Sequence, residues 1–216
     1  MAAWDVTRRH ADGGTEAILA FRAWRLVWDA QVAQPRLAPT TPRPAWPPRA
    51  APAATCSGSH TRLYMVFDPT ATPHRSPDAG CTCGWHAVRD PRTLVRPGGP
   101  AAVIGQVSLW GQVIEHAKGW RAEFAYPARL RLVCSRCART GRWPAEPATV
   151  ARRGAELVPA CVAHAALDPD PGGGEPAGLI QAALLDAYAV ELLPVEALPS
   201  VEAVDVVTRV RRAFER

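Results

Sequence analysis

The sequence lacks any long hydrophobic run. No stretch approaches the ~18 consecutive apolar residues that a membrane-spanning helix requires. Residues 1–14 (MAAWDVTRRHADGG) are polar and charged where a signal peptide would be apolar. We therefore expect a cytoplasmic protein with no membrane contact. In that compartment cysteine thiols stay reduced, so they are available to bind metal and do not form disulfides.

Lysine is almost absent, because Lys118 is the only one and every other basic side chain is arginine. The formal net charge of +5 is of the kind that often indicates a polyanionic partner such as nucleic acid. Alanine, proline and glycine are abundant, however, as expected from a GC-rich genome. Codon bias can therefore account for much of the basicity, and the total charge does not identify a partner.

Several catalytic signatures are also missing. The sequence has no His-Glu-x-x-His, and no His-x-Glu with a paired Pro-Cys-x-x-Cys, which removes the commonest signatures of zinc hydrolases and nucleobase deaminases. The glycine-rich stretch Pro171–Gly174 lacks the lysine and the serine or threonine of a phosphate-binding loop. It is predicted to be a flexible linker.

Six cysteines are present, and four Cys/His residues have the spacing of a metal site. Cys134-Ser-Arg-Cys137 places two thiols on a tight turn, and Cys161-Val-Ala-His164 supplies a second short pair. Two such pairs complete the tetrahedral coordination that a structural zinc ion requires. Buried free cysteines and disulfides of an exported protein are the simpler alternatives.

A second zinc site is predicted upstream, where five candidate ligands are available for four positions. Its most compact part is a Cys-x-Cys pair preceded by a histidine seven residues earlier. The surplus of ligands leaves an open, catalytic geometry as an alternative to structural zinc. The candidate ligands are Cys56, His74, Cys81 and Cys83, with His60 as the alternative.

The clearest secondary structure is a long hairpin. Val103–His116 alternates strictly between two faces and predicts a strand, Ala117–Gly119 predicts a turn, and Trp120–Tyr126 predicts the partner strand, which Pro127 should end. Two glycines inside the first strand predict a bulge, a bend or a close backbone approach, so we expect strong curvature. The outward row of Gln106, Ser108, Trp110 and Gln112 is a candidate recognition surface.

Other segments are assigned from local pattern. Leu19–Val27 and Leu63–Phe67 are predicted strands, whereas the proline-rich stretch Gln34–Ala54 cannot hold a helix interior or a central strand. Ala177–Leu193 and Ser200–Arg216 are predicted helices. The second helix carries a valine stripe that would favour a scaffold role in a protein complex if it were exposed.

An arginine cluster surrounds the first cysteine pair and makes it a candidate binding site for nucleic acid. Guanidinium groups match phosphate bidentately and stack on bases, although such a cluster is also typical of a solvated surface turn. The candidate partner-binding residues are Arg129, Arg131, Arg136, Arg139, Arg142 and Trp110.

The hairpin also supplies the main argument for an enzyme. Glu115 and His116 precede the turn and Arg121 and Glu123 follow it, so pairing could gather two carboxylates, an imidazole and a guanidinium. The alternative is a set of ordinary salt bridges on an exposed hairpin, and no nucleophile motif accompanies these residues. The sequence leaves the question of catalysis open and favours a non-catalytic protein.

Three motifs together resemble an uncharacterised bacterial family of the actinobacterial type: FRAWR over Phe21–Arg25, CTCG over Cys81–Gly84, and VIGQVSLWGQVIEHAKGWRAEFAYP over Val103–Pro127. The resemblance covers roughly residues 17–165 and implies no established function. Relatives often show Gly-Ile-Tyr-Ala after the Cys-x-Cys, whereas this chain has an additional imidazole there, His86. The curved hairpin loosely resembles PUA-like nucleic-acid-binding barrels at the level of fold.

Together these patterns predict an α+β protein with a curved, small barrel-like antiparallel β core, zinc-stapled loops and C-terminal helices. We expect a flexible N-terminus over 1–16, a zinc-bound domain over 17–167, a linker over 168–176 and a helical segment over 177–216. The expected function is a zinc-stabilised, non-catalytic binding or regulatory module with one or two zinc ions. Its partner is expected to be a macromolecule, nucleic acid or protein.

Overall fold

The computed structural model describes residues 6–10 (backbone only), 17–41, 44–56, 74–95, 98–141, 144–167 and 174–198. The strands are β1 (Val6–His10), β2 (Ile18–Asp29), β3 (Gln34–Pro39), β4 (Trp85–Val88), β5 (Val103–His116), β6 (Gly119–Leu132), β7 (Thr149–Arg153), β8 (Glu156–Ala160), β9 (Gly174–Pro176) and β10 (Glu191–Leu192). The helices are α1 (Ser135–Arg139), α2 (Val162–Ala165) and α3 (Ala177–Tyr188), with short 3₁₀ turns η1 (Pro91–Leu94) and η2 (Val195–Ala197).

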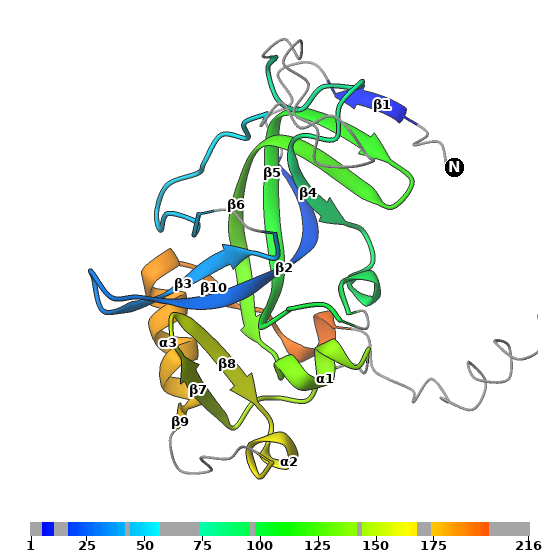
Figure 1. The fold of residues 1–216 in the computed structure, drawn as a ribbon. Helices are drawn as coiled ribbons and strands as arrows, with labels where there is room; N and C mark the ends of the chain where they lie inside the picture. Colours follow the sequence, from blue (N-terminus) through cyan, green and yellow to red (C-terminus); the bar gives the residue numbers. More distant parts are fainter. Residues whose placement is uncertain are drawn as a thin grey trace, which may run out of the picture.

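Four strands close into a ring in the order β2, β5, β6 and β4, with antiparallel pairing at every contact (Figure 1). The closure between β2 and β4 consists of one residue pair, Phe21 with Val88, so the ring is not a clean barrel. β3 and β8 extend the sheet from β2, while β10 joins β6 in parallel. This arrangement confirms the predicted α+β class with a curved antiparallel β core.

The hairpin of β5 and β6 is the longest feature of the sheet, and β5 has the predicted bounds. The prediction that Pro127 ends the pairing is wrong, because β6 continues to Leu132. A register shift between Gln106 and Val107 puts a bulge beside Pro127, where a missing backbone N–H is tolerated. The bulge adds to the curvature of the hairpin.

The two glycines of β5 are required for different reasons, a bulge and a close backbone approach. Both reasons were among those predicted for them. Gly111 has a φ of +75° and lies in the second register shift, between Trp110 and Val113, so it forms a bulge in the left-handed region. Gly105 lies where strands crowd, since a Cβ there would be 2.2 Å from the backbone oxygen of Arg129. Only a residue without a side chain allows that approach.

The core of the ring is rich in aromatic side chains. Trp24 and Trp46 are fully buried and meet edge to face, with ring centroids 5.6 Å apart. Helix α3 covers this core with Ile180, Leu184 and Tyr188. The Tyr188 hydroxyl donates to the Trp46 carbonyl oxygen at 2.7 Å, which ties the proline-rich loop to the helix.

The observed strands and helices can be compared with the remaining predicted segments. β2 contains the predicted strand Leu19–Val27, and the proline-rich stretch contributes only the edge strand β3, as its prolines require. Helix α3 ends at Tyr188, earlier than the predicted Leu193, because Ala189 adopts the left-handed conformation with φ 52°. None of the described helices is long and apolar enough to cross a membrane.

Several predictions fall outside the described residues, namely the strand Leu63–Phe67, the helix Ser200–Arg216, the ligand alternative His60, and Arg142. Strand β1 lies within the segment predicted to be a flexible N-terminus and pairs with the end of β5. The division of the chain into domains and a linker stays a prediction.

Substitution of Gly105 by alanine is expected to destabilise the protein by about 2–3 kcal/mol, because the new Cβ overpacks the contact between β5 and β6. Gly178→Ala on α3 is the matched control, since a Cβ there meets no atom within 4 Å. That control should leave stability unchanged or raise it by up to ~1 kcal/mol. Urea denaturation of both variants measures the difference, and a Gly105→Ala protein as stable as the wild type would contradict the close approach.

Candidate metal centres

The first candidate centre forms where β6 ends and where β8 ends. Cys134 and Cys137 flank the start of α1, and Cys161 and His164 flank the start of α2. The His164 Nδ1 atom lies 3.2 Å from the Cys134 sulfur and 3.4 Å from the sulfurs of Cys137 and Cys161. All four ligand atoms lie within 4.8 Å of one another, so the group could hold a metal ion.

Short helical turns orient the four ligands of this centre. The Ala138 N–H donates to the Cys134 carbonyl at 3.0 Å, and the His164 N–H donates to the Cys161 carbonyl at 2.9 Å. Each turn therefore directs both members of its pair to the same side. The three cysteines are buried and form a small cluster of their own, while His164 is half-buried.

The thiols of this first group differ in acidity. Burial opposes ionisation of Cys134, but backbone N–H groups of Cys137 and Cys161, together with His164, lower the pKa of Cys134 to about 7. Burial, with a smaller contribution from the neighbouring Cys134, raises the pKa of Cys137 to about 11. Cys134 is thus available as a thiolate near neutral pH, whereas a metal must displace the proton of Cys137.

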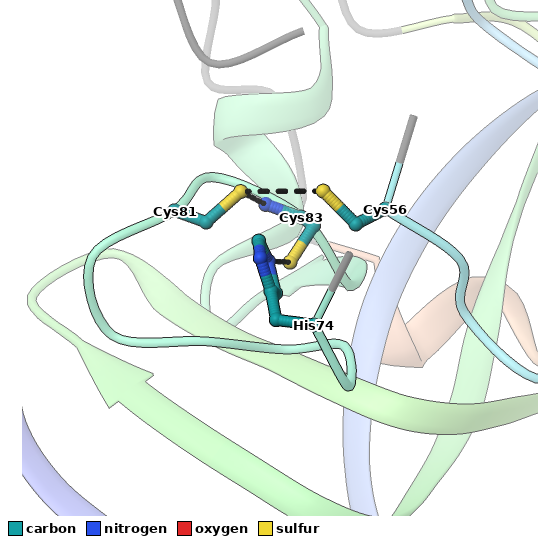
Figure 2. Close-up of side chains that lie close together, drawn as sticks. All are labelled: Cys56, His74, Cys81 and Cys83. Carbon is teal, nitrogen blue, oxygen red and sulfur yellow. Dashed lines mark hydrogen bonds between the residues drawn. The ribbon is translucent and has the colours of Figure 1, made fainter. Parts of the chain in front are cut away.

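The second candidate centre gathers Cys56, His74, Cys81 and Cys83, again within 4.8 Å of one another (Figure 2). The Cys56 and Cys81 sulfurs are 3.8 Å apart, and the His74 Nε2 atom lies 3.3 Å from the Cys83 sulfur. The extra imidazole, His86, does not join the group, because its Nε2 donates to the Thr82 carbonyl at 2.8 Å.

The thiols of the second centre also differ in pKa. Burial raises the pKa of Cys81 to about 11, with further contributions from Cys83 and Cys56. Burial also opposes ionisation of Cys83, yet His74 and the backbone N–H of Asp78 help to lower the pKa of Cys83 to about 7. Each centre therefore has one acidic thiol beside one that retains its proton.

Two of the predicted acid–base residues of the hairpin, Arg121 and Glu123, form contacts that support the fold. Arg121 is buried and donates to the backbone carbonyls of Cys81 and Cys83, the latter at 3.1 Å. Glu123 is 8% exposed and forms a bidentate ion pair with Arg75, at 2.9 and 2.8 Å. Both residues therefore hold the second centre against β6.

The remaining two members of that cluster lie elsewhere on the hairpin. Glu115 forms an ion pair with Arg89, whose guanidinium also donates to the His116 carbonyl at 2.9 Å. The His116 side chain is buried, and its pKa is lowered by that burial and by the positive charges of Arg121 and Arg89. Glu115, Arg121 and Glu123 are thus each held by a charged or backbone partner.

The arginines predicted to bind a partner differ in their surroundings. Arg129 pairs with Glu191 at 3.2 Å, and Arg131 donates to the Leu193 carbonyl at 2.6 Å. Arg136 and Arg139 lie on α1 beside the first centre and have no acidic partner within the described part of the chain. Trp110 is half-buried and stacks on Phe124, with centroids 5.9 Å apart.

Sequence reasoning missed Arg75 and Ala54. Arg75 directly follows the ligand His74 and pairs with Glu123, and the Ala54 N–H donates to the Glu123 backbone oxygen at 2.7 Å. Adjacency to a ligand was the only sequence signal for Arg75. A backbone contact between distant segments leaves no such signal.

Comparison with protein-family models, curated proteins and solved structures finds no match to this chain. The resemblance to an uncharacterised bacterial family therefore stays a prediction.

Metal binding should release protons from both groups, and affinity should rise with pH. At pH 8 the thiols of Cys137 and Cys81, with pKa values of about 11, still carry protons that metal must displace. Cys134 and Cys83, with pKa values of about 7, are largely ionised and add little. Titration calorimetry at pH 8 in two buffers of different ionisation enthalpy counts the protons. We expect at least one proton per metal ion, and a count of zero would contradict this assignment.

Proposed function

We propose that the protein is a zinc-stabilised, non-catalytic binding module with two structural zinc ions. The observation that carries this proposal is the closure of both ligand groups, each with three thiols and one imidazole within 4.8 Å. Structural zinc takes four protein ligands, whereas catalytic zinc keeps one position open for water or substrate. Four ligands at each group leave no open position.

Zinc fits the donor atoms and their spacing. Thiolates and imidazole are the ligands that zinc prefers, and tetrahedral bonds of ~2.3 Å to sulfur and ~2.0 Å to nitrogen separate ligand atoms by about 3.5–3.8 Å. The Cys56–Cys81 sulfur separation of 3.8 Å matches this spacing, and the sulfur–nitrogen distances of 3.2–3.4 Å at His164 are slightly shorter. Bound zinc would fasten loops that contain little regular structure, and its binding energy would add to folding stability.

A non-catalytic role is supported by the state of the candidate acid–base residues. Glu123 is paired with Arg75, Glu115 with Arg89, and Arg121 with backbone carbonyls. A general acid or base must be free to reach a substrate proton. Arg121 and Glu123 instead support the fold around the second group.

For the partner we propose nucleic acid, bound at the knuckle of the first group. Arg136 and Arg139 lie on α1 next to Cys137, and within the described residues no carboxylate neutralises them. Free guanidinium groups held by a rigid metal knuckle suit phosphate contacts. On the hairpin face, the stacked Trp110 and Phe124 offer aromatic rings of the kind that bind unstacked bases.

The wild-type protein should carry two zinc ions, and Cys134→Ser and Cys81→Ser should each carry one. Each substitution removes one ligand from a different group. Native mass spectrometry counts the ions, with Ser135→Ala as the control that should retain both. A wild-type protein with one zinc ion or none would overturn the two-site proposal.

The double variant Arg136→Gln/Arg139→Gln should bind a labelled single-stranded oligonucleotide at least several-fold more weakly. The slope of log affinity against log salt should become less negative by about 1–2, because two phosphate contacts are lost. Fluorescence anisotropy at several salt concentrations measures both quantities. Arg49→Gln/Arg92→Gln is the matched control, since it removes the same charge from exposed arginines that have internal partners. Equal losses in both variants would show only a non-specific charge effect.

A further inference from the structure

The second metal group is assembled on one short stretch of β6, residues 121–124. Its ligands come from three segments, and each segment is fastened to this stretch separately. Ala54, two residues before Cys56, donates its N–H to the Glu123 backbone oxygen at 2.7 Å. Arg75, next to His74, pairs with the Glu123 carboxylate, and Arg121 holds the carbonyls of Cys81 and Cys83.

Glu123 connects this assembly to the bulge of β5. Its Oε2 atom accepts the Gln112 backbone N–H at 3.1 Å, and it accepts Arg75 Nη2 at 2.8 Å. The neighbouring residue Gly111 forms the bulge, and a Cβ there would lie 2.8 Å from the same oxygen. One buried carboxylate thus contacts both the metal-ligand segment and the backbone of the bulge.

The bulge lies directly beside the aromatic pair on the hairpin face. Trp110 precedes Gly111, and Phe124 follows Glu123, with the two rings nearly parallel at 17°. A bulge sets the direction in which neighbouring side chains point. The position of Glu123 therefore bears on the geometry of this aromatic pair.

The ion pair with Arg75 determines how stable the buried position of Glu123 is. With Arg75 in place, the Glu123 charge is neutralised in a position that is 8% exposed. Without Arg75, the carboxylate would remain buried with no counter-charge from the described residues, which favours its movement to water and the release of the Gln112 N–H. Because His74 precedes Arg75 in the chain, a metal ion that fixes His74 also limits where Arg75 can go.

We infer that metal binding at Cys56, His74, Cys81 and Cys83 controls the conformation of the Trp110–Phe124 face, with Glu123 as the positioning residue between them. This inference rests on the proposed function, because it requires that metal binds the second group. By linkage, metal should stabilise the bulge, and the formed bulge should raise metal affinity by the same factor. The first group makes no such contact with Glu123 within the described residues.

The test compares zinc affinity in four full-length variants: Arg75→Gln, Glu123→Gln, their double variant, and Glu115→Gln as the matched control. Glu115 pairs with Arg89 on the same hairpin, so this variant removes a carboxylate of the same kind from a different ion pair. Competition with a chelator removes the zinc, and alkylation of the released cysteines shows whether Cys81 or Cys134 has lost it. Arg75 is 72% exposed in its side chain, so Arg75→Gln keeps the test valid if Glu123→Gln does not fold.

We expect the second group to bind zinc 10–100-fold more weakly in Arg75→Gln and Glu123→Gln, the usual range for residues that support metal ligands. The first group and Glu115→Gln should be unchanged. Hydrogen exchange provides the second readout: zinc removal should speed exchange of the Gln112 amide at least 10-fold in the wild type, with no further change in Glu123→Gln.

Two results would overturn the inference. One is unchanged zinc affinity at the second group in both single variants, and the other is Gln112 exchange that does not respond to zinc. Neither result would contradict zinc binding at the second group. A wild-type protein that binds no zinc at Cys81 would instead overturn the proposed second site, and the inference with it.

Discussion

The long strand β6 is the constraint on which the rest of the structure depends. It pairs with β5 and with β4 in the ring, and it accepts β10 near its end. The second metal group is fastened to residues 121–124, and the first begins at Cys134, two residues after the strand ends. The two groups are thus separated by roughly 35 Å of strand, at ~3.3 Å per residue. A single strand fixes both centres in one framework.

Several of the described arginines donate hydrogen bonds to backbone carbonyls of the same chain. Proline-rich segments have fewer backbone N–H donors, so some of their carbonyl oxygens need donors from side chains. Arginine has five N–H donors in a fixed geometry and supplies them well. Arg25 donates to the Pro39 carbonyl, and Arg131 to that of Leu193, which precedes Pro194. Several of the described arginines therefore serve the fold, whereas Arg136 and Arg139 have no acidic partner among the described residues.

The hairpin and the two ligand sets were within reach of sequence reasoning, for physical reasons. A strict two-residue period predicts a strand, and glycines within it predict a bulge or a close contact, as Gly111 and Gly105 confirm. Short ligand spacings likewise bring the paired Cys/His residues of each set close together. The bulge beside Pro127 could not be predicted, because it depends on the register in which β5 and β6 pair. The ion pair of Arg75 with Glu123 depends on tertiary contacts between distant segments, so local pattern cannot reveal it.

The central claim is that both metal groups are complete, closed zinc centres. X-ray absorption at the zinc edge of the fully loaded protein tests it directly, because the spectrum reports the donor atoms and their distances. Two closed centres should give an average of about three sulfur atoms at ~2.3 Å and one nitrogen at ~2.0 Å per zinc ion. An additional oxygen ligand in place of a sulfur, or fewer than four protein donors, would contradict closure and restore an open, catalytic zinc.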